Sequence, residues 1–308
     1  MSTFKSSRPA VLELAARYKE LAEEAEKGAD GRDSEQVEQA NRILFSEMCE
    51  ICLWGNATDL SLLTSLTYED IQKLQGSEAR KASEKNILVN DLDAAFDVLQ
   101  KARRERKNEE RRVDIVLDNS GFELFVDLIL AGYLLSAGLA TTVVLHPKLI
   151  PWFVSDVTPP DFAALIDALS DAQGFYTAPD DSGKTFDPLS EKEVSEVKFL
   201  FDHWSHLHQE GKLIIRPHAF WTTPGGYWRM PHTAPELFND LKESELVLFK
   251  GDLNYRKLTN DVGPPPPPSP LSYLMCLLTS VRITSPSGTR PPRSPRPSDP
   301  WARTPAFA

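Results

Sequence analysis

The sequence predicts an α/β protein, an α/β/α sandwich with a mainly parallel sheet, preceded by an all-helical region and followed by a disordered tail. Three observations predict it. Residues 8–111 place apolar side chains at helical spacing. From Val113 the pattern changes to short apolar runs that alternate with helices, which is typical of a parallel sheet covered on both faces. After Val262 the composition can no longer bury a core.

The first predicted domain, residues 1–111, is a helical N-terminal region. Cys49 and Cys52 form a C-x-x-C pair inside a helical pattern. A zinc ribbon needs a second such pair, which the sequence lacks, so the pattern favours buried helix thiols. The stretch Lys101–Arg112 is almost entirely charged, and it predicts a solvated linker at the domain boundary.

The second predicted domain, residues 112–262, is the α/β domain that carries the chemistry. Its predicted strands are Val113–Leu117, Thr141–Leu145, Leu213–Arg216 and Leu246–Phe249. The helices predicted between them are Phe122–Ser136, Phe162–Ala168 and Glu191–His208. The segment Ala178–Leu189 is polar, contains glycine and proline, and predicts an exposed loop.

The third predicted segment, residues 263–308, is rich in proline, arginine and serine. It opens with the run Pro264–Pro268 and holds about half of the 24 prolines of the chain. This composition predicts disorder, and Leu271–Val281 is the stretch apolar enough to pack. We interpret the segment as the aberrant ending of a truncated domain that lacks a final strand and helix.

Composition excludes several classes of function. The 308-residue chain carries a net charge of −11, which argues against nucleic acid or an anionic membrane as the main partner. It has no apolar run of about 18 residues and no signal-peptide pattern at its start. Three cysteines do not make a disulfide framework. We therefore expect a cytoplasmic protein, with the nucleus as a second location.

Asp118 and Asn119 directly follow the first predicted strand. Gly121 then allows a sharp turn into a helix. Open α/β sheets place their chemistry at this edge, beside helix N-termini. Carboxylate and amide oxygens are ligands that a hard divalent cation prefers. The same residues are also common turn formers, and the motif alone gives that alternative equal weight.

Two further segments reach the same edge of the predicted sheet. Asp156 follows the second strand and could supply another carboxylate. The segment Lys250–Lys257 follows a later strand and contains a glycine turn. Its cationic residues, Lys250, Arg256 and Lys257, suit a phosphate group, whereas Asp252 and Asn254 suit hydroxyl groups. In the helical half, Trp54–Ser61 predicts a polar loop of the kind that often carries function.

Four ordered motifs resemble those of one known family. They are LWGNATDLSLL, DIVLDNSGFELFVDLILA, HPKLIPWFVSD and LFKGDLNYRKL, and the resemblance covers roughly residues 40–262. The chain resembles the metal-dependent damage-control phosphatases, in the branch that acts on sugar phosphates. Members of that branch have also been described as protein-glutamate O-methyltransferases, or acidic-residue methyltransferases.

The resemblance implies a site, a cofactor and a substrate class. It implies that Asp118, Asn119 and Asp156 are the catalytic residues and bind a divalent metal, Mn²⁺ or Mg²⁺, with Co²⁺ or Ni²⁺ tolerated. The implied substrates are small phosphorylated sugars such as fructose 1-phosphate and fructose 6-phosphate. The residues implied to contact the substrate are Asp118, Asn119, Asp252, Leu253, Asn254, Tyr255 and Arg256.

The chain departs from this branch at one motif, Arg-Thr-x-Lys, whose lysine is expected to help hold the phosphoryl group. Arg303-Thr304-Pro305-Ala306 begins correctly but ends on alanine, so we read it as coincidence. One alternative is therefore a catalytically impaired product. Another is an S-adenosylmethionine-dependent protein-glutamate O-methyltransferase, although no glycine-rich loop follows the first strand to hold that cofactor. The general acid, the nucleophile and any protein partner stay unassigned.

Several other side chains are weaker candidates. The spacing of His203, His206 and His208 spreads them around a helix, which favours a surface helix over a metal site. His146 follows a strand and could support a ligand or simply end the strand. Glu123 could orient a ligand or the phosphosugar.

We expect Asp127, which lies four residues after Glu123, to be a solvated helix residue. An aromatic group surrounds a pair of glycines later in the chain, where packing of a loop is favoured over a sugar pocket. Its members are Phe220, Trp221, Tyr227 and Trp228.

Overall fold

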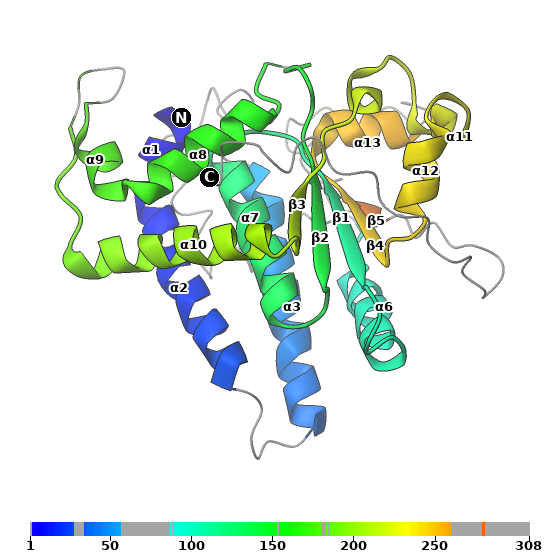
Figure 1. Ribbon diagram of the computed structural model, residues 1–308, viewed down its shortest axis with the longest axis horizontal. Helices are drawn as coiled ribbons and strands as arrows, with labels where there is room; N and C mark the ends of the chain where they lie inside the picture. Colours follow the sequence, from blue (N-terminus) through cyan, green and yellow to red (C-terminus); the bar gives the residue numbers. More distant parts are fainter. Residues whose placement is uncertain are drawn as a thin grey trace.

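A mainly parallel sheet forms the centre of the molecule (Figure 1). The computed structural model describes residues 2–27, 34–56, 87, 89–152, 154–179, 183, 185–259 and 279–280. The strand order is β3-β2-β1-β4-β5, with β5 alone antiparallel to its neighbour. The strands are β1 Arg112–Val116, β2 Thr142–His146, β3 Leu213–Ile215, β4 Leu246–Phe249 and β5 Thr279–Ser280.

Helices precede the sheet and cover both of its faces (Figure 1). The α-helices of the described residues are α1 Ser2–Ser6, α2 Arg8–Lys27, α3 Ser34–Asn56, α6 Leu92–Glu105, α7 Phe122–Ser136, α8 Pro159–Ser170, α9 Ala172–Thr177, α10 Glu191–Gln209, α11 Met230–Thr233, α12 Pro235–Leu241 and α13 Gly251–Thr259. Two short 3₁₀ turns are η1 Ala219–Thr222 and η2 Tyr227–Arg229. The predicted α/β/α sandwich is confirmed.

Successive residues of β1 contribute to two different cores, because side chains alternate across a strand. Val113 and Ile115 belong to the larger core, which the helices α2, α3, α7 and α10 share. Val116 belongs to a smaller core with Phe249 and Trp221, on the side of α12 and α13. Figure 1 shows these two groups of helices on opposite sides of the sheet.

Helix α7 is the centre of the larger core. Every residue from Phe122 to Leu134 is buried, because the helix contacts β2 and is packed against α2 and α3. The N-terminal helices therefore share a core with the sheet. Cys49 and Cys52 are buried free thiols on α3, as predicted.

The charged stretch Lys101–Arg112 is exposed or partly exposed along most of its length, as predicted, but its ends belong to α6 and β1, and Arg111 and Arg112 are buried. Helix α6 continues to Glu105, and β1 already begins at Arg112. Arg111 and Arg112 are 7% and 3% exposed. The charge-rich composition did not predict the burial of Arg111 and Arg112, since a long charged side chain can be buried when its charged end has partners.

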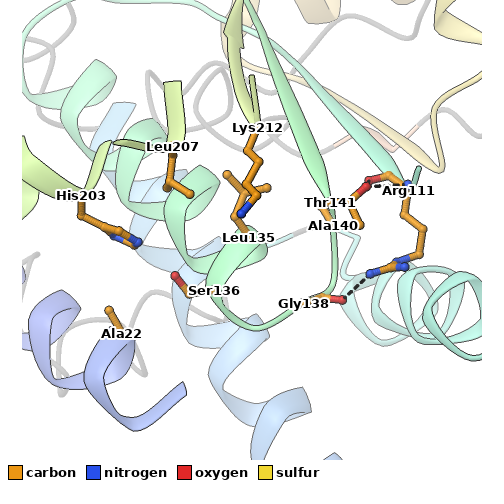
Figure 2. A pocket seen from close by; sticks show the side chains of 10 residues that line it. All are labelled: Ala22, Arg111, Leu135, Ser136, Gly138, Ala140, Thr141, His203, Leu207 and Lys212. Carbon is orange, nitrogen blue, oxygen red and sulfur yellow. Dashed lines mark hydrogen bonds between the residues drawn. The ribbon is translucent and has the colours of Figure 1, made fainter. Parts of the chain in front are cut away.

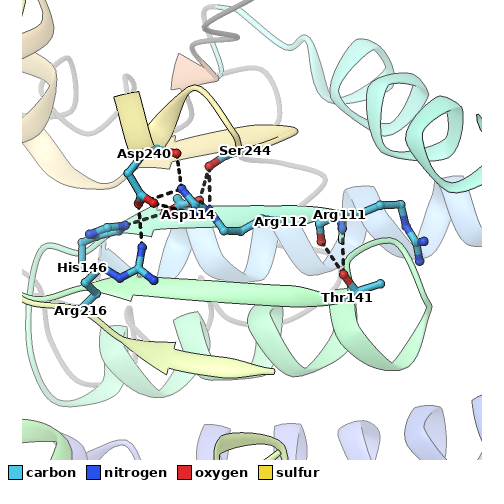
Figure 3. A network of polar contacts seen from close by, with 8 residues as sticks. All are labelled: Arg111, Arg112, Asp114, Thr141, His146, Arg216, Asp240 and Ser244. Carbon is cyan, nitrogen blue, oxygen red and sulfur yellow. Dashed lines mark hydrogen bonds and ion pairs between the residues drawn. The ribbon is translucent and has the colours of Figure 1, made fainter. Parts of the chain in front are cut away.

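One buried polar network crosses the face of the sheet that carries the smaller core (Figure 3). Asp114 of β1 accepts from Arg112 Nε at 2.7 Å and lies 2.7 Å from His146 Nε2. Although burial opposes its charge, the hydrogen bond with His146 and the charge of Arg112 lower the pKa of Asp114. Arg112 also pairs with Asp240 at 3.0 Å, which joins α12 to β1. His146 thus ends its strand inside a structural network.

The tail lies outside the described residues except at β5. Thr279 and Ser280 pair with Phe249 and Leu248 of β4 and extend the sheet. They fall within the stretch Leu271–Val281, which the sequence singled out as apolar enough to pack. No helix in the described part of the chain is long and apolar enough to cross a membrane.

Candidate functional site

The carboxyl ends of β1 and β4 each lead into a helix through a glycine with positive φ. Gly121 (φ 77°) precedes α7, and Gly251 (φ 84°) begins α13. Any side chain at Gly251 would collide with Asp118, because a Cβ there would lie 1.8 Å from Asp118 Oδ2. Gly251 therefore serves two purposes: it adopts the positive φ, and it lets the backbone of α13 approach the Asp118 carboxylate.

The loop after β2 brings Asp156 to Asn119. These two residues form an isolated antiparallel bridge. Val157 N–H donates to Asp118 O at 2.8 Å, and Ser155 Oγ donates to Asn119 Oδ1 at 2.7 Å. The structure thus brings together the three predicted metal ligands, Asp118, Asn119 and Asp156, which are 4%, 9% and 3% exposed.

The environment of Asp118 disfavours its negative charge. Burial, followed by the charge of Glu123, raises the pKa of Asp118 well above its usual value, and Lys148 opposes the shift. Asp156 and Asp252 add further negative charge nearby. A site that gathers buried carboxylates in this way gains stability from a bound cation.

Lys148 is the cation that the chain itself supplies, and the sequence reasoning missed it. Its side chain is fully buried, and its ammonium contacts Asp156 Oδ1 and lies 3.6 Å from Asp118 Oδ1. Lys148 comes two residues after β2, at the same edge of the sheet as Asp118. The strand-end rule that selected Asp156 could therefore have selected Lys148 as well.

Glu123 holds the amide of Asn119. Asn119 Nδ2 donates to Glu123 Oε2 at 2.9 Å and to Asp118 Oδ2 at 3.0 Å. These bonds turn the amide oxygen of Asn119 toward Ser155. Glu123 thus orients the Asn119 amide, and its predicted role toward a metal ligand or the phosphosugar stays a prediction.

Lys250 lies beneath the site rather than in it. Its ammonium is fully buried, 2.6 Å from Asp127 Oδ1 and 3.2 Å from Glu123 Oε1, and it donates to Cys52 O at 3.1 Å. Burial opposes the charge, but Asp127 and then Cys52 and Glu123 raise the pKa of Lys250. The prediction that Lys250 suits a phosphate is corrected accordingly.

The prediction for Asp127 is also wrong, because Asp127 is fully buried rather than solvated. It accepts from Cys52 Sγ at 3.0 Å as well as from Lys250. The helical region, through Cys52 on α3, is therefore joined by polar contacts to Glu123 and so to Asn119. The apolar periodicity of α7 did not predict the burial of Asp127. Its partner Lys250 lies far away in the sequence, and a local pattern cannot report such a pair.

The predicted substrate segment, residues 252–256, lies in the first turns of α13, and its residues differ in how far they are exposed to solvent. Asp252 and Arg256 are partly exposed and 3.5 Å apart. Leu253 is buried, and Tyr255 is half-buried. Asn254 is fully buried, with Nδ2 donating to Leu117 O and Lys250 O and Oδ1 accepting from Tyr227. Asn254 therefore fixes α13 to the end of β1.

Lys257 adds a second cation that the structure brings toward the acids. Its pKa is lowered, first by burial and then by the charge of Lys148, while Asp156 raises it. The ammonium lies 5.3 Å from the ring centroid of Trp152 and 5.6 Å from that of Tyr227. These rings form an aromatic wall beside Lys257.

The remaining aromatic and histidine candidates have structural roles. Phe220, Trp221 and Tyr227 pack in the smaller core, and Trp228 is 64% exposed, so packing explains most of the aromatic group. The three helix histidines contact different groups: His203 lies 2.9 Å from Tyr18 Oη, His206 lies 3.4 Å from Glu210, and His208 lies 2.8 Å from Leu213 O.

The donor set at the strand ends fits a hard divalent cation. Asp118, Asn119 and Asp156 converge and supply oxygen ligands, and the backbone at Gly251 approaches Asp118 so closely that no side chain fits at position 251. Within the described residues, no three His, Cys, Asp or Glu side chains form a metal cluster. The candidate set is therefore two carboxylates and one amide, with Lys148 beside them.

Comparison with known proteins connects this geometry to a family. A profile of the Damage-control phosphatase ARMT1-like domain matches residues 1–282. The chain belongs to the ARMT1-like damage-control phosphatase family. Members of this family are in general metal-dependent.

Individual relatives belong to the same family as the matching profile. The chain is 36% identical to Damage-control phosphatase ARMT1 of Xenopus tropicalis over 261 residues, which are 84% of this chain and 52% of the relative. It is 40% identical to Damage-control phosphatase ARMT1 of Homo sapiens over 219 residues, which are 70% of this chain and 44% of the relative. The chain thus spans about half the length of the curated relatives that it matches.

Proposed function

We propose that this ARMT1-like chain is a metal-dependent phosphatase that hydrolyses small sugar phosphates such as fructose 1-phosphate and fructose 6-phosphate. The observation that carries the proposal is the convergence of Asp118, Asn119 and Asp156 beside Lys148. Membership of a damage-control phosphatase family supports phosphate-ester hydrolysis as the reaction.

Asp118, Asn119 and Asp156 would hold Mn²⁺ or Mg²⁺, with Co²⁺ or Ni²⁺ tolerated, and the cation would polarise a phosphoryl oxygen. Glu123 fixes the amide of Asn119 by accepting its hydrogen bond. Gly251 lets the backbone approach without displacing Asp118.

Cationic side chains would bind the phosphoryl group. Arg256 is 41% exposed at its side chain and lies 3.5 Å from Asp252, and a guanidinium offers the planar pair of donors that suits a phosphate. Lys257 and Lys148 supply further positive charge close to Asp156. Phosphoryl transfer gathers negative charge on the equatorial oxygens, which these residues would neutralise.

Recognition of the sugar is proposed for the exposed side of α13. Asp252 is partly exposed and can accept hydrogen bonds from hydroxyl groups. Tyr255 is half-buried on the same helix. Leu253 and Asn254 would contribute mainly by fixing the helix, since Leu253 is buried and the Asn254 amide is bonded to β1 and Tyr227.

Two other functions make different predictions. A protein-glutamate methyltransferase must bind S-adenosylmethionine, yet the turn after β1 presents Asp118 and Asn119 instead of a glycine-rich loop. A catalytically impaired protein would bind metal and sugar phosphate without turnover.

One preparation of the full chain can separate the three functions. Phosphate release from fructose 1-phosphate and fructose 6-phosphate is measured with Mn²⁺, next to methyl transfer from S-adenosylmethionine to acidic peptides. We expect Mn²⁺-dependent phosphate release and no methyl transfer. Methyl transfer alone would support the second function, and binding of fructose 6-phosphate without release would support the third.

A further inference from the structure

The loop between β2 and α8 carries several exposed apolar side chains. They are Leu149, Ile150, Trp152 and Val154, which are 42%, 54%, 40% and 92% exposed. Apolar side chains that gather on an exposed loop typically mark a contact with a ligand or a partner. The neighbours of this loop indicate which of the two it contacts.

Both ends of the loop are fixed beside Asp156. At its start, the Lys148 ammonium contacts Asp156 Oδ1. At its end, Ser120 N–H donates to Ser155 O at 2.9 Å, one residue before Asp156. Since only residues 149–154 lie between these anchors, the loop stays close to the proposed metal ligand. Its apolar side chains therefore lie beside the proposed catalytic site.

Trp152 is the residue of this loop that contacts a proposed phosphate-binding cation. The Lys257 ammonium lies over its ring, 5.3 Å from the ring centroid, and 5.6 Å from the ring centroid of Tyr227. Burial and then the charge of Lys148 lower the pKa of Lys257, and Asp156 raises it, so both residues are within electrostatic reach. Tyr227 is buried, whereas Trp152 is exposed. Trp152 thus offers free aromatic surface beside Lys257.

A sugar phosphate has groups that match this arrangement. Its phosphoryl group suits the cations Lys257 and Arg256, and its hydroxyl groups suit polar side chains such as Asp252. The face of a sugar ring that carries C–H groups is less polar, and it gains from burial against apolar or aromatic surface. Because the Trp152 ring lies beside Lys257, a sugar attached to the phosphoryl group would lie next to Trp152.

A cavity elsewhere in the fold is not placed for this role. Its volume is about 370 Å³, and Arg111, Thr141 and Lys212 of its lining directly precede β1, β2 and β3 (Figure 2). It lies at the opposite end of the strands from Asp118, and the seven positions from Arg111 to Asp118 span roughly 20 Å when extended. Figure 2 shows the Arg111 guanidinium turned to Gly138 O, to which it donates at 3.3 Å. A sugar phosphate bound there could not reach the proposed metal ligands.

We propose that Trp152 is a specificity-determining residue, whose exposed ring packs against the C–H face of the sugar while Lys257 binds the phosphoryl group. This inference rests on the proposed sugar-phosphate phosphatase function. It divides recognition between two kinds of side chain: the cations bind the phosphate, and Trp152 selects for the sugar.

The test compares the full-length wild type with Trp152→Ala and Trp152→Phe in the presence of Mn²⁺. Trp152→Ala should raise KM for fructose 6-phosphate about tenfold and leave kcat nearly unchanged, because packing on the sugar contributes equally before and during the reaction. Trp152→Phe keeps an aromatic ring and should retain most of the affinity. Inorganic phosphate, which has no sugar, should inhibit all three proteins with the same inhibition constant.

Trp228→Ala is the matched control, because it removes another exposed tryptophan, which lies on η2. Its KM should be that of wild type. An unchanged KM in Trp152→Ala, or an equal rise in Trp228→Ala, would overturn the inference. So would an inhibition constant of inorganic phosphate that rises as much as KM does, because Trp152 would then act only through the phosphate-binding cations.

Failure of the proposed function gives a different result. If wild type releases no phosphate, calorimetric titration with fructose 6-phosphate in Mn²⁺ measures binding alone. A dissociation constant that Trp152→Ala raises about tenfold would then refute the phosphatase function and still support the role of Trp152. Equal dissociation constants, or no binding by wild type, would overturn the inference.

Discussion

Glu123 accepts a 2.9 Å hydrogen bond from the side-chain amide of Asn119, so an acid on α7 sets the orientation of a proposed metal ligand. Glu123 also lies 3.2 Å from Lys250 and is 3% exposed. The proposed ligand set is therefore backed by a buried ion pair. Partners of this kind affect metal affinity although they do not touch the metal.

Replacing Glu123 should weaken metal binding. In Glu123→Leu the amide of Asn119 loses its acceptor, and we expect Mn²⁺ affinity to fall roughly 10- to 100-fold. Glu123→Gln keeps an acceptor oxygen and should lose less. Calorimetric titration with Mn²⁺ compares the two. Wild-type affinity in Glu123→Leu would show that the hydrogen bond has no orienting role.

Asp118→Asn should stabilise the metal-free protein and abolish its stabilisation by Mn²⁺. The pKa of Asp118 is raised in the fold, first by burial and then by Glu123, so its ionisation opposes folding. For a carboxyl group with a raised folded pKa, stability is greatest below its unfolded value of about 4 and is lost as pH rises through the folded value.

Melting temperature measured against pH, with EDTA and then with Mn²⁺, checks this prediction. The metal-free wild type should lose stability over that pH window relative to Asp118→Asn, and only the wild type should gain stability with Mn²⁺. Parallel pH profiles of the two metal-free proteins would contradict the electrostatic argument.

Lys148→Met should destabilise the metal-free protein strongly. The variant leaves Asp118 and Asp156 buried without their cation, and breaking a buried pair typically costs about 3–5 kcal/mol. Mn²⁺ should restore more stability to this variant than it adds to wild type, because the metal replaces the missing charge. Urea unfolding with and without Mn²⁺ measures both effects. A metal-free variant as stable as wild type would refute the pairing.

Arg256→Ala should weaken binding of sugar phosphate without changing Mn²⁺ affinity. A charged hydrogen bond is worth about 1.5–3 kcal/mol, which corresponds to roughly 10- to 100-fold in affinity. Arg229→Ala is a suitable control, because Arg229 is an exposed arginine on the neighbouring turn η2. KM for fructose 6-phosphate is the readout, and an unchanged value would remove Arg256 from the substrate site.

Sequence patterns predicted the elements that local composition determines. The apolar run Leu246–Phe249 is β4, and Phe122–Ser136 is α7. The convergence of Asp118 with Asp156 followed from the rule that parallel strands end at one edge, and the structure confirms that they meet. Their proposed role as metal ligands stays a prediction.

Charged residues were harder to place, because their burial depends on partners far away in the sequence. Lys250 suited a phosphate by its type, but its partner is Asp127, which lies 123 positions earlier. Arg112 belonged to a charged run that predicts solvent exposure, and it is buried at the start of β1 with Asp240, 128 positions later, as a partner. No local pattern reports such pairings.

Direct measurement of Mn²⁺ binding tests the central claim, that Asp118, Asn119 and Asp156 hold the metal. The EPR signal of free Mn²⁺ is followed as the full chain is added, for wild type, Asp118→Ala and Asp156→Ala. Asp202→Ala, a surface acid paired with Lys198, is the control. We predict that both site variants lose more than about 100-fold in Mn²⁺ affinity, because each lacks a metal ligand. Loss of a residue that only orients a ligand, such as Glu123, costs roughly 10- to 100-fold. The control should bind Mn²⁺ like wild type. Wild-type Mn²⁺ affinity in Asp118→Ala and Asp156→Ala would contradict the account.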